Sequence, residues 1–102
     1  MTRRVHRYAG RDWPDPRNTR AWRRLAEQVA AEERTCWLRL PGCTRLSQTA
    51  DHVIPVTARP DLAMTRSNLR GACHHCNNQR KNTPIDQLER AHQRPAALSI
   101  FD

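Results

Sequence analysis

Two short stretches of the sequence carry side chains that could do chemistry together. The first is Asp51-His52, in a short apolar segment that predicts a strand, and the second is residues 73–77, CHHCN. Aspartate is an anionic metal ligand, and histidine is a base that titrates near neutral pH. The CxxC pair has the spacing of a structural zinc site, and Asn77 adds an oxygen donor directly beside it. These residues predict a structural metal site that adjoins a second site holding an acid and a base.

An earlier pair of cysteines extends the predicted metal site. Cys36 and Cys43 have six residues between them, a wider spacing than the usual knuckle of zinc proteins, so this pair is weak evidence alone. Together with Cys73 and Cys76 it predicts a closed four-cysteine zinc site. Two alternatives stay open, namely two disulfides, or a mixed site in which a histidine of residues 73–77 replaces one cysteine.

The composition predicts a small, basic domain. The chain has 102 residues, 37% of them hydrophobic, so we expect one domain whose small core depends on a metal ion for part of its stability. Eighteen basic residues against ten acidic ones give a net charge of +8, and Lys81 is the only lysine. Arginine suits phosphate, and no long apolar or amphipathic basic segment could enter a membrane. We therefore expect nucleic acid as the partner and no membrane.

Neither a membrane span nor a secretion signal is visible in the sequence. No apolar run approaches the roughly 18 residues of a transmembrane helix. Residues 1–10 carry charge, but no apolar segment follows them. We therefore expect a cytoplasmic protein, and in that reducing compartment cysteines bind metal more readily than they form disulfides.

The N-terminal segment differs in pattern from the chain after it. Residues 1–17 contain Gly10, two prolines and five arginines, without a helical or alternating period. We expect a flexible basic arm, which either has no role or contacts phosphates without reading sequence. Residues 18–102 are then a single domain with its core at about residues 36–81.

Helical spacing begins after this arm. Trp22, Leu25 and Val29 recur on one face, with Asn18 or Thr19 available as N-cap, which predicts an amphipathic helix of about 14 residues. We expect this helix to cover the back of the metal-bound core.

Two strands and two further helices are predicted beyond it. Residues 49–56 are rich in β-branched side chains, and residues 68–72 return to the core after a loop at 58–67. A short helix should follow within the second cysteine pair. A last helix should begin at Thr83, with proline at its first position, and run to about Gln93.

Four separate elements, in this order, resemble the HNH endonuclease family, in particular its zinc-containing members. They are Cys36-x6-Cys43, residues 51–55 (DHVIP), residues 68–70 (NLR) and residues 73–77 (CHHCN). The similarity runs from about Cys36 to Lys81. It implies an α+β fold with a small, treble-clef-like ββα-metal core. Helices flank this core on the N- and C-terminal sides, and a structural four-cysteine zinc site lies beside one catalytic metal ion.

The resemblance also implies a role for each motif residue. His52 matches the general base that takes a proton from water, and Asp51 and Asn77 match the ligands of the catalytic metal. Asn68 matches the central asparagine that braces the loop and is counted among the catalytic residues. Phosphodiester hydrolysis needs a deprotonated water, a cation and the positioning of each. Hard oxygen ligands suit Mg²⁺ or Mn²⁺, with softer divalent ions as competitors.

Two further expectations concern the surroundings of the motif. Arg70, Arg80 and Lys81 flank the site and either bind DNA phosphates or form a solvated charged surface. Adjacent residues of a regular strand point to opposite faces, so Asp51 and His52 could not reach one phosphate from a straight strand. We therefore predict that the strand is bulged or ends at these two residues, and a straight, regular strand there would count against the mechanism.

The resulting prediction is a metal-dependent DNA endonuclease of low sequence specificity that leaves 5′-phosphate and 3′-hydroxyl ends. The small size resembles stand-alone HNH proteins of bacteriophages, which work beside the terminase in DNA packaging. Terminase is then a candidate partner, the host cytoplasm the location, and a monomer the favoured state. The alternative is a catalytically inactive zinc module that binds nucleic acid through its arginines.

Overall fold

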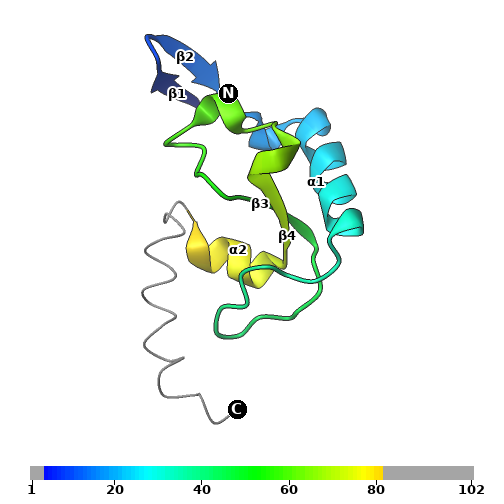
Figure 1. The fold of residues 1–102 in the computed structure, drawn as a ribbon. Coiled ribbons are helices and arrows are strands. Elements are labelled where there is room, and N and C mark those ends of the chain that lie inside the picture. The colour runs from blue at the N-terminus through cyan, green and yellow to red at the C-terminus, as the bar shows by residue number, and fades with distance from the viewer. Residues whose placement is uncertain (1–3, 82–102) are drawn as a thin grey trace.

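The computed structural model describes residues 4–81 of the chain (Figure 1). Its elements are strands β1 (Val5–Tyr8) and β2 (Arg11–Pro14), helix α1 (Arg20–Glu32), strands β3 (Thr49–His52) and β4 (Leu69–Ala72), helix α2 (His74–Arg80), and the 3-10 turns η1 (Pro16–Asn18), η2 (Pro60–Leu62) and η3 (Arg66–Asn68). The α+β class is confirmed. The helix expected from Thr83 lies outside the described residues, within which no helix is long and apolar enough to cross a membrane.

The site is built on the antiparallel pair β3–β4, with helices on either side. The register runs from Thr49 opposite Ala72 to His52 opposite Leu69. Helix α1 lies along one side of this pair, and α2 follows β4 and packs beside β3 (Figure 1). The order β3, β4, α2 is the expected ββα arrangement.

The predicted amphipathic helix is confirmed as α1, with 13 residues against about 14 expected. Thr19 is its N-cap, because its side-chain oxygen accepts a hydrogen bond from the amide of Trp22 at 3.1 Å. Trp22 and Val29 bury their side chains against Leu69 of β4. Burying side chains of this size stabilises a fold by roughly 1.5–3 kcal/mol each, so this contact fixes α1 on the strand pair.

The second hydrophobic core is small and consists largely of thiols. Its buried aliphatic members are Leu38, Leu40 and Ala72, and the rest of the buried cluster is cysteine. So few apolar side chains cannot fix the loop between α1 and β3 by themselves. The stability of this half of the fold must depend on what the thiols bind.

The prediction of an arm without regular structure at the N-terminus is wrong. Strands β1 and β2 pair as an antiparallel hairpin from Val5 opposite Pro14 to Tyr8 opposite Arg11. Ala9 and Gly10 form the turn with φ angles of 54° and 79°, the left-handed backbone that a tight hairpin requires. The hairpin packs against η2. Its strands contain exposed and half-buried residues but no fully buried one, so they lack the apolar stripe that marks a strand in sequence. The boundary placed at residue 17 stays a prediction.

A hydrogen-bonded carboxylate joins the end of α1 to β4. Glu33 accepts hydrogen bonds from the guanidinium of Arg70 at 2.8 Å, from that of Arg66 at 2.8 Å and from the amide of Gly71 at 3.2 Å. Although burial opposes ionisation, these donors lower the pKa of Glu33 to about 2. The charged carboxylate therefore stabilises this junction fully above pH 4.5, and its contribution decreases as the pH falls towards about 2.

Gly71 lies so close to this junction that a side chain should not fit. A Cβ atom there would overlap the backbone oxygen of Glu33 and the hydroxyl of Ser47. We expect Gly71→Ala to destabilise the zinc-loaded protein by about 1–3 kcal/mol, measured as a lower urea midpoint. Gly10→Ala is the control, since its Cβ meets nothing and only its positive φ is strained. An unchanged midpoint for Gly71→Ala would contradict the close packing.

Candidate active site and zinc centre

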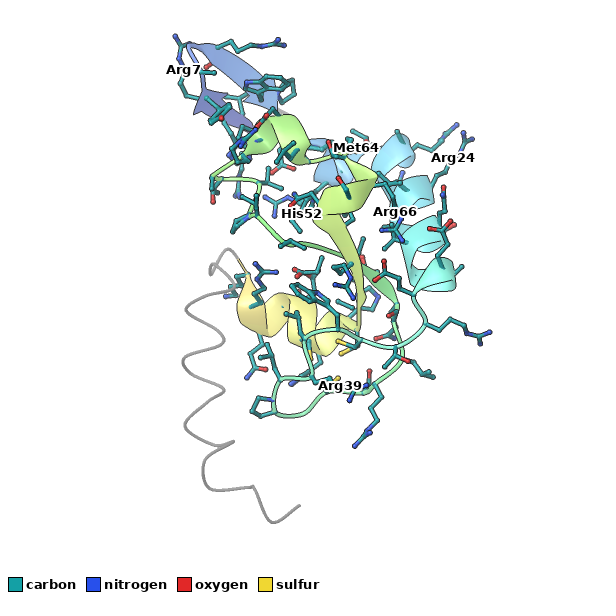
Figure 2. All side chains as sticks on the ribbon, in the orientation of Figure 1. Arg7, Arg24, Arg39, His52, Met64 and Arg66 are labelled. Carbon is teal, nitrogen blue, oxygen red and sulfur yellow. The ribbon has the colours of Figure 1, made fainter. Side chains whose placement is uncertain are left out.

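The four cysteines gather beside the start of α2, where sulfur atoms cluster in Figure 2. Their sulfur atoms all lie within 4.8 Å of one another, and none forms a disulfide. In a tetrahedral zinc site with Zn–S bonds of about 2.3 Å, neighbouring sulfurs lie about 3.8 Å apart. Backbone amides also point at the sulfurs, from Leu40 to Cys76 and from Arg45 to Cys43, at 3.3 Å each. The cluster could therefore bind a structural zinc ion. Its members are Cys36, Cys43, Cys73 and Cys76.

The two histidines inside the CxxC pair lie outside this cluster. His74 and His75 are exposed, and the imidazole Nε2 of His75 lies 2.7 Å from the carbonyl oxygen of Pro41. The mixed cysteine–histidine site is therefore not the arrangement found. Cys73 instead begins α2, because its sulfur accepts a hydrogen bond from the amide of Cys76 at 3.4 Å.

Asp51 is buried on the side of β3 that faces α2. Its carboxylate Oδ2 accepts a hydrogen bond from the indole of Trp37 at 3.0 Å and forms an ion pair with Arg80. Burial raises the pKa of Asp51, while the Arg80 guanidinium and the Trp37 indole oppose that rise. A cation placed near this carboxylate would favour its ionised form further.

His52 points to the opposite side of β3. Its ring stacks on the indole of Trp22, with centroids 4.8 Å apart and planes 15° from parallel. Its Nε2 lies 2.9 Å from the carbonyl oxygen of Ala63. A carbonyl can only accept, so the neutral ring carries its hydrogen on Nε2 and keeps a lone pair on Nδ1. Burial lowers the pKa of His52 to about 4, against the hydrogen bond to Ala63, which raises it, while the opposite charges of Arg17 and Asp15 act in opposite directions.

The expected bulge at these residues is absent, whereas β3 does end at His52, the other departure that was expected. Asp51 pairs with Arg70 and His52 with Leu69 in regular antiparallel register. They nevertheless line the same pocket, of about 200 Å³. Its walls include Trp22 from α1, on one side of β3, and Asn77 from α2, on the other. The pocket therefore reaches around the edge of β3 that does not pair with β4, and a straight strand can present adjacent residues to it.

The pocket brings together four residues singled out in the sequence. Asp51 and His52 come from β3, Asn77 comes from α2, and Lys81 follows that helix. Asn77 comes directly after a cysteine of the cluster, so the thiol centre fixes the turn of α2 that presents the amide.

The comparison with protein families agrees with this geometry. The family model described as HNH endonuclease matches residues 34–83, which include the cysteine cluster, β3, β4 and α2. Residues 34–83 form an HNH endonuclease domain. Neither the curated proteins nor the solved structures compared with the chain gave a match.

In this HNH domain, Asn68 lies behind the pocket rather than on its wall. Its side-chain oxygen accepts a hydrogen bond from the amide of Ile54 at 2.9 Å. Its amide group donates to the carbonyl oxygens of Ile54 at 3.2 Å and Leu62 at 3.3 Å. These bonds tie the chain after β3 to the loop that carries Ala63, the partner of His52. Asn68 is thus placed to position the imidazole, not to touch a substrate.

The three cations expected to bind phosphates occupy different environments. Arg80 is only 1% exposed, and it also donates to the carbonyl oxygen of Val53 at 2.6 Å, so its predicted phosphate contact does not fit its position. Arg70 is about half exposed but is paired with Glu33. Lys81 is exposed and lines the pocket, so it is the best placed of the three to meet a phosphate.

Arg17 is a pocket residue that sequence patterns missed, because it was included in the basic arm. It lies on η1, where Asp15 is the N-cap and Pro16 the first residue of the turn, and Thr19 then caps α1. Two successive caps predict an ordered turn rather than a flexible arm. That local signal was present in the sequence.

Proposed function

We propose that this HNH domain is a metal-dependent DNA endonuclease in which His52 is the general base. The observation that carries the proposal is the shared pocket, in which an imidazole with a lone pair on Nδ1 lies with the oxygen donors of Asp51 and Asn77. Abstraction of a proton from water needs a neutral base held within reach of that water. The low pKa of His52 keeps the ring neutral at physiological pH.

Asp51 and Asn77 would hold the catalytic cation, for which we propose Mg²⁺ or Mn²⁺. The donor set fits, since a carboxylate and an amide oxygen are hard ligands and leave positions open for water and phosphate. Because Arg80 occupies Oδ2 of Asp51, a metal ion would use the other oxygen or displace the guanidinium. The bound ion would offset the negative charge that develops on the phosphate oxygens during cleavage.

The zinc centre has a mechanical role in this proposal. Four thiolates satisfy a zinc ion and leave no open position, so the zinc takes no part in the chemistry. It fixes Cys76 and therefore Asn77, whereas Trp22 and Ala63 fix His52 independently. Zinc binding and catalysis should thus be lost together when the thiols are removed.

The substrate is proposed to be DNA, cut with little sequence preference to leave 5′-phosphate and 3′-hydroxyl ends. The net charge of +8 favours a polyanion through release of its counterions. A place beside a phage terminase in DNA packaging is part of this proposal, by resemblance to the HNH proteins of bacteriophages.

One observation favours the alternative, a catalytically inactive module that binds nucleic acid. Arg80 already neutralises Asp51, as a structural ion pair would. Purified, zinc-loaded protein should convert supercoiled plasmid to nicked or linear forms with Mg²⁺ or Mn²⁺. Cleavage should be absent when the catalytic ion is omitted. Salt-sensitive DNA binding without cleavage under any of several divalent ions would favour the inactive module.

A further inference from the structure

A cation that lies outside the HNH motif forms part of the pocket wall. Arg17 lines the pocket together with Asp51, His52 and Asn77, although η1 precedes the residues that match the family model. Its side chain is about one-third exposed. It can therefore contact a ligand in the pocket, while the buried part of the side chain is held by its neighbours.

The guanidinium of Arg17 is fixed by the carboxylate of Asp15. The Nε of Arg17 donates to the two oxygens at 3.0 and 3.1 Å, and Nη2 donates to one of them at 2.6 Å. Its backbone amide also donates to this carboxylate, at 2.9 Å. A guanidinium held in this way loses little rotational freedom when it binds a second anion.

Asp15 is itself held from the N-terminal hairpin. It is 7% exposed, and its Oδ2 lies 2.9 Å from the imidazole Nε2 of His6 in β1. Its backbone amide donates to the carbonyl oxygen of Arg4 at 2.7 Å, which extends the hairpin ladder. Although burial opposes ionisation, the hydrogen bonds from Arg17 and His6 hold the pKa of Asp15 well below its ordinary value. The hairpin therefore positions an ionised carboxylate beside the guanidinium of Arg17.

The charges around the pocket favour binding of an anion. Asp51 is paired with Arg80 and Asp15 with Arg17, and Lys81 on the wall adds a further positive charge. Among the described residues, Nη1 of Arg17 has no hydrogen-bond partner, since its bonds to Asp15 use Nε and Nη2. Guanidinium groups bind phosphate oxygens through paired N–H donors.

We propose that Arg17 binds the phosphodiester that enters this pocket, with Asp15 as a positioning residue that orients it. The proposal rests on the proposed nuclease function, because the pocket is taken as the place of cleavage. This phosphate contact comes from a residue that precedes the HNH segment, and the N-terminal hairpin contributes to it by holding Asp15 in place.

The test compares Arg17→Gln with the matched control Arg24→Gln. Arg24 is exposed on α1 and points away from His52 in Figure 2, so its removal changes net charge equally without touching the pocket. The substrates are supercoiled plasmid and bis(4-nitrophenyl) phosphate, a small diester with one phosphate. We expect Arg17→Gln to lower kcat/KM by about 10–100-fold on each substrate, with Arg24→Gln within about twofold of wild type on the small diester. Arg17→Lys should recover part of the loss.

Asp15→Asn tests the positioning role. The side-chain oxygen of asparagine can still accept from the backbone amide and from Nε of Arg17. Its NH2 group, at the position of Oδ2, cannot accept from Nη2, and the negative charge beneath the guanidinium is lost. The single variant should lose activity, and adding Asp15→Asn to Arg17→Gln should cause no further loss. Losses that multiply in the double variant would show that Asp15 acts on stability alone and would overturn its positioning role.

Other outcomes overturn the proposal for Arg17. These are no loss on either substrate, or a loss on plasmid alone, which would place the contact at a neighbouring phosphate. If the wild type cuts neither substrate, the proposed nuclease function fails by itself. Arg17 is then judged by titrating dimethyl phosphate into the metal-free, zinc-loaded protein by NMR. Shifts of pocket signals in wild type that vanish in Arg17→Gln support the contact, and their absence in wild type overturns it.

Discussion

Replacing His52 with glutamine is expected to lower the rate constant for plasmid cleavage by about 10²–10⁴-fold, the usual contribution of a general base. Glutamine has no basic nitrogen at neutral pH, so water would have to be deprotonated by solvent. DNA affinity should stay within about twofold, because the imidazole is buried and is neutral in the free protein. Single-turnover cleavage and salt-matched DNA binding measure the two quantities separately.

Glutamine is a better replacement than alanine here. Its side-chain amide can donate to the carbonyl oxygen of Ala63 and can lie flat against Trp22, as the imidazole does. Alanine would leave a cavity beside the indole, and a loss of stability could be mistaken for a loss of chemistry. His52→Gln should therefore keep its zinc content and a melting temperature close to that of wild type.

His74→Gln is the matched control, since His74 is exposed on α2 and lies outside the pocket and the cysteine cluster. It should cleave at the wild-type rate. A His52→Gln variant that is folded and cuts DNA within about threefold of wild type would remove His52 from the mechanism.

The parts of the fold that follow local rules could be predicted from the sequence. Helix α1 has a clear period and a threonine cap, and the cysteine spacing identified the thiol cluster. Each depends on residues close in sequence or on ligands with few alternative partners. The hairpin β1–β2 could not be predicted in this way, because it packs against η2 through long-range contacts and has no buried stripe.

The interaction partners of the site residues also could not be predicted from local sequence patterns. Asp51 meets Arg80, 29 positions away, and that pairing turned an expected phosphate ligand into a buried counter-ion. Regular pairing of β3 was expected to place the side chains of Asp51 and His52 on opposite faces, out of reach of one ligand. Both side chains nevertheless line one pocket, which extends around the edge of the strand. Sequence spacing indicates which face a side chain takes, but the position of a pocket depends on how elements distant in sequence pack.

Removal of zinc is expected to unfold the domain rather than only inactivate it. Three buried thiols and three aliphatic side chains make up the second hydrophobic core, with the fourth thiol, that of Cys43, packed against it. Structural zinc contributes roughly 10–16 kcal/mol in small zinc domains, which equals or exceeds the total stability of about 5–15 kcal/mol typical of a domain. Stripping the ion under reducing conditions should therefore abolish the cooperative thermal transition, and readdition of zinc should restore it.

Removal of the catalytic ion should give a different result, and the contrast makes the prediction specific. Without Mg²⁺ or Mn²⁺ the protein should melt as before and only cleavage should stop, because Arg80 still neutralises Asp51 in the folded state. Cys73→Ser should behave like zinc removal, whereas His75→Gln should keep its zinc, since His75 lies outside the cluster. A zinc-free protein that still melts cooperatively at the original temperature would show that the thiol cluster is dispensable. In that case the packing of α2, and not zinc binding at Cys76, would determine the position of Asn77.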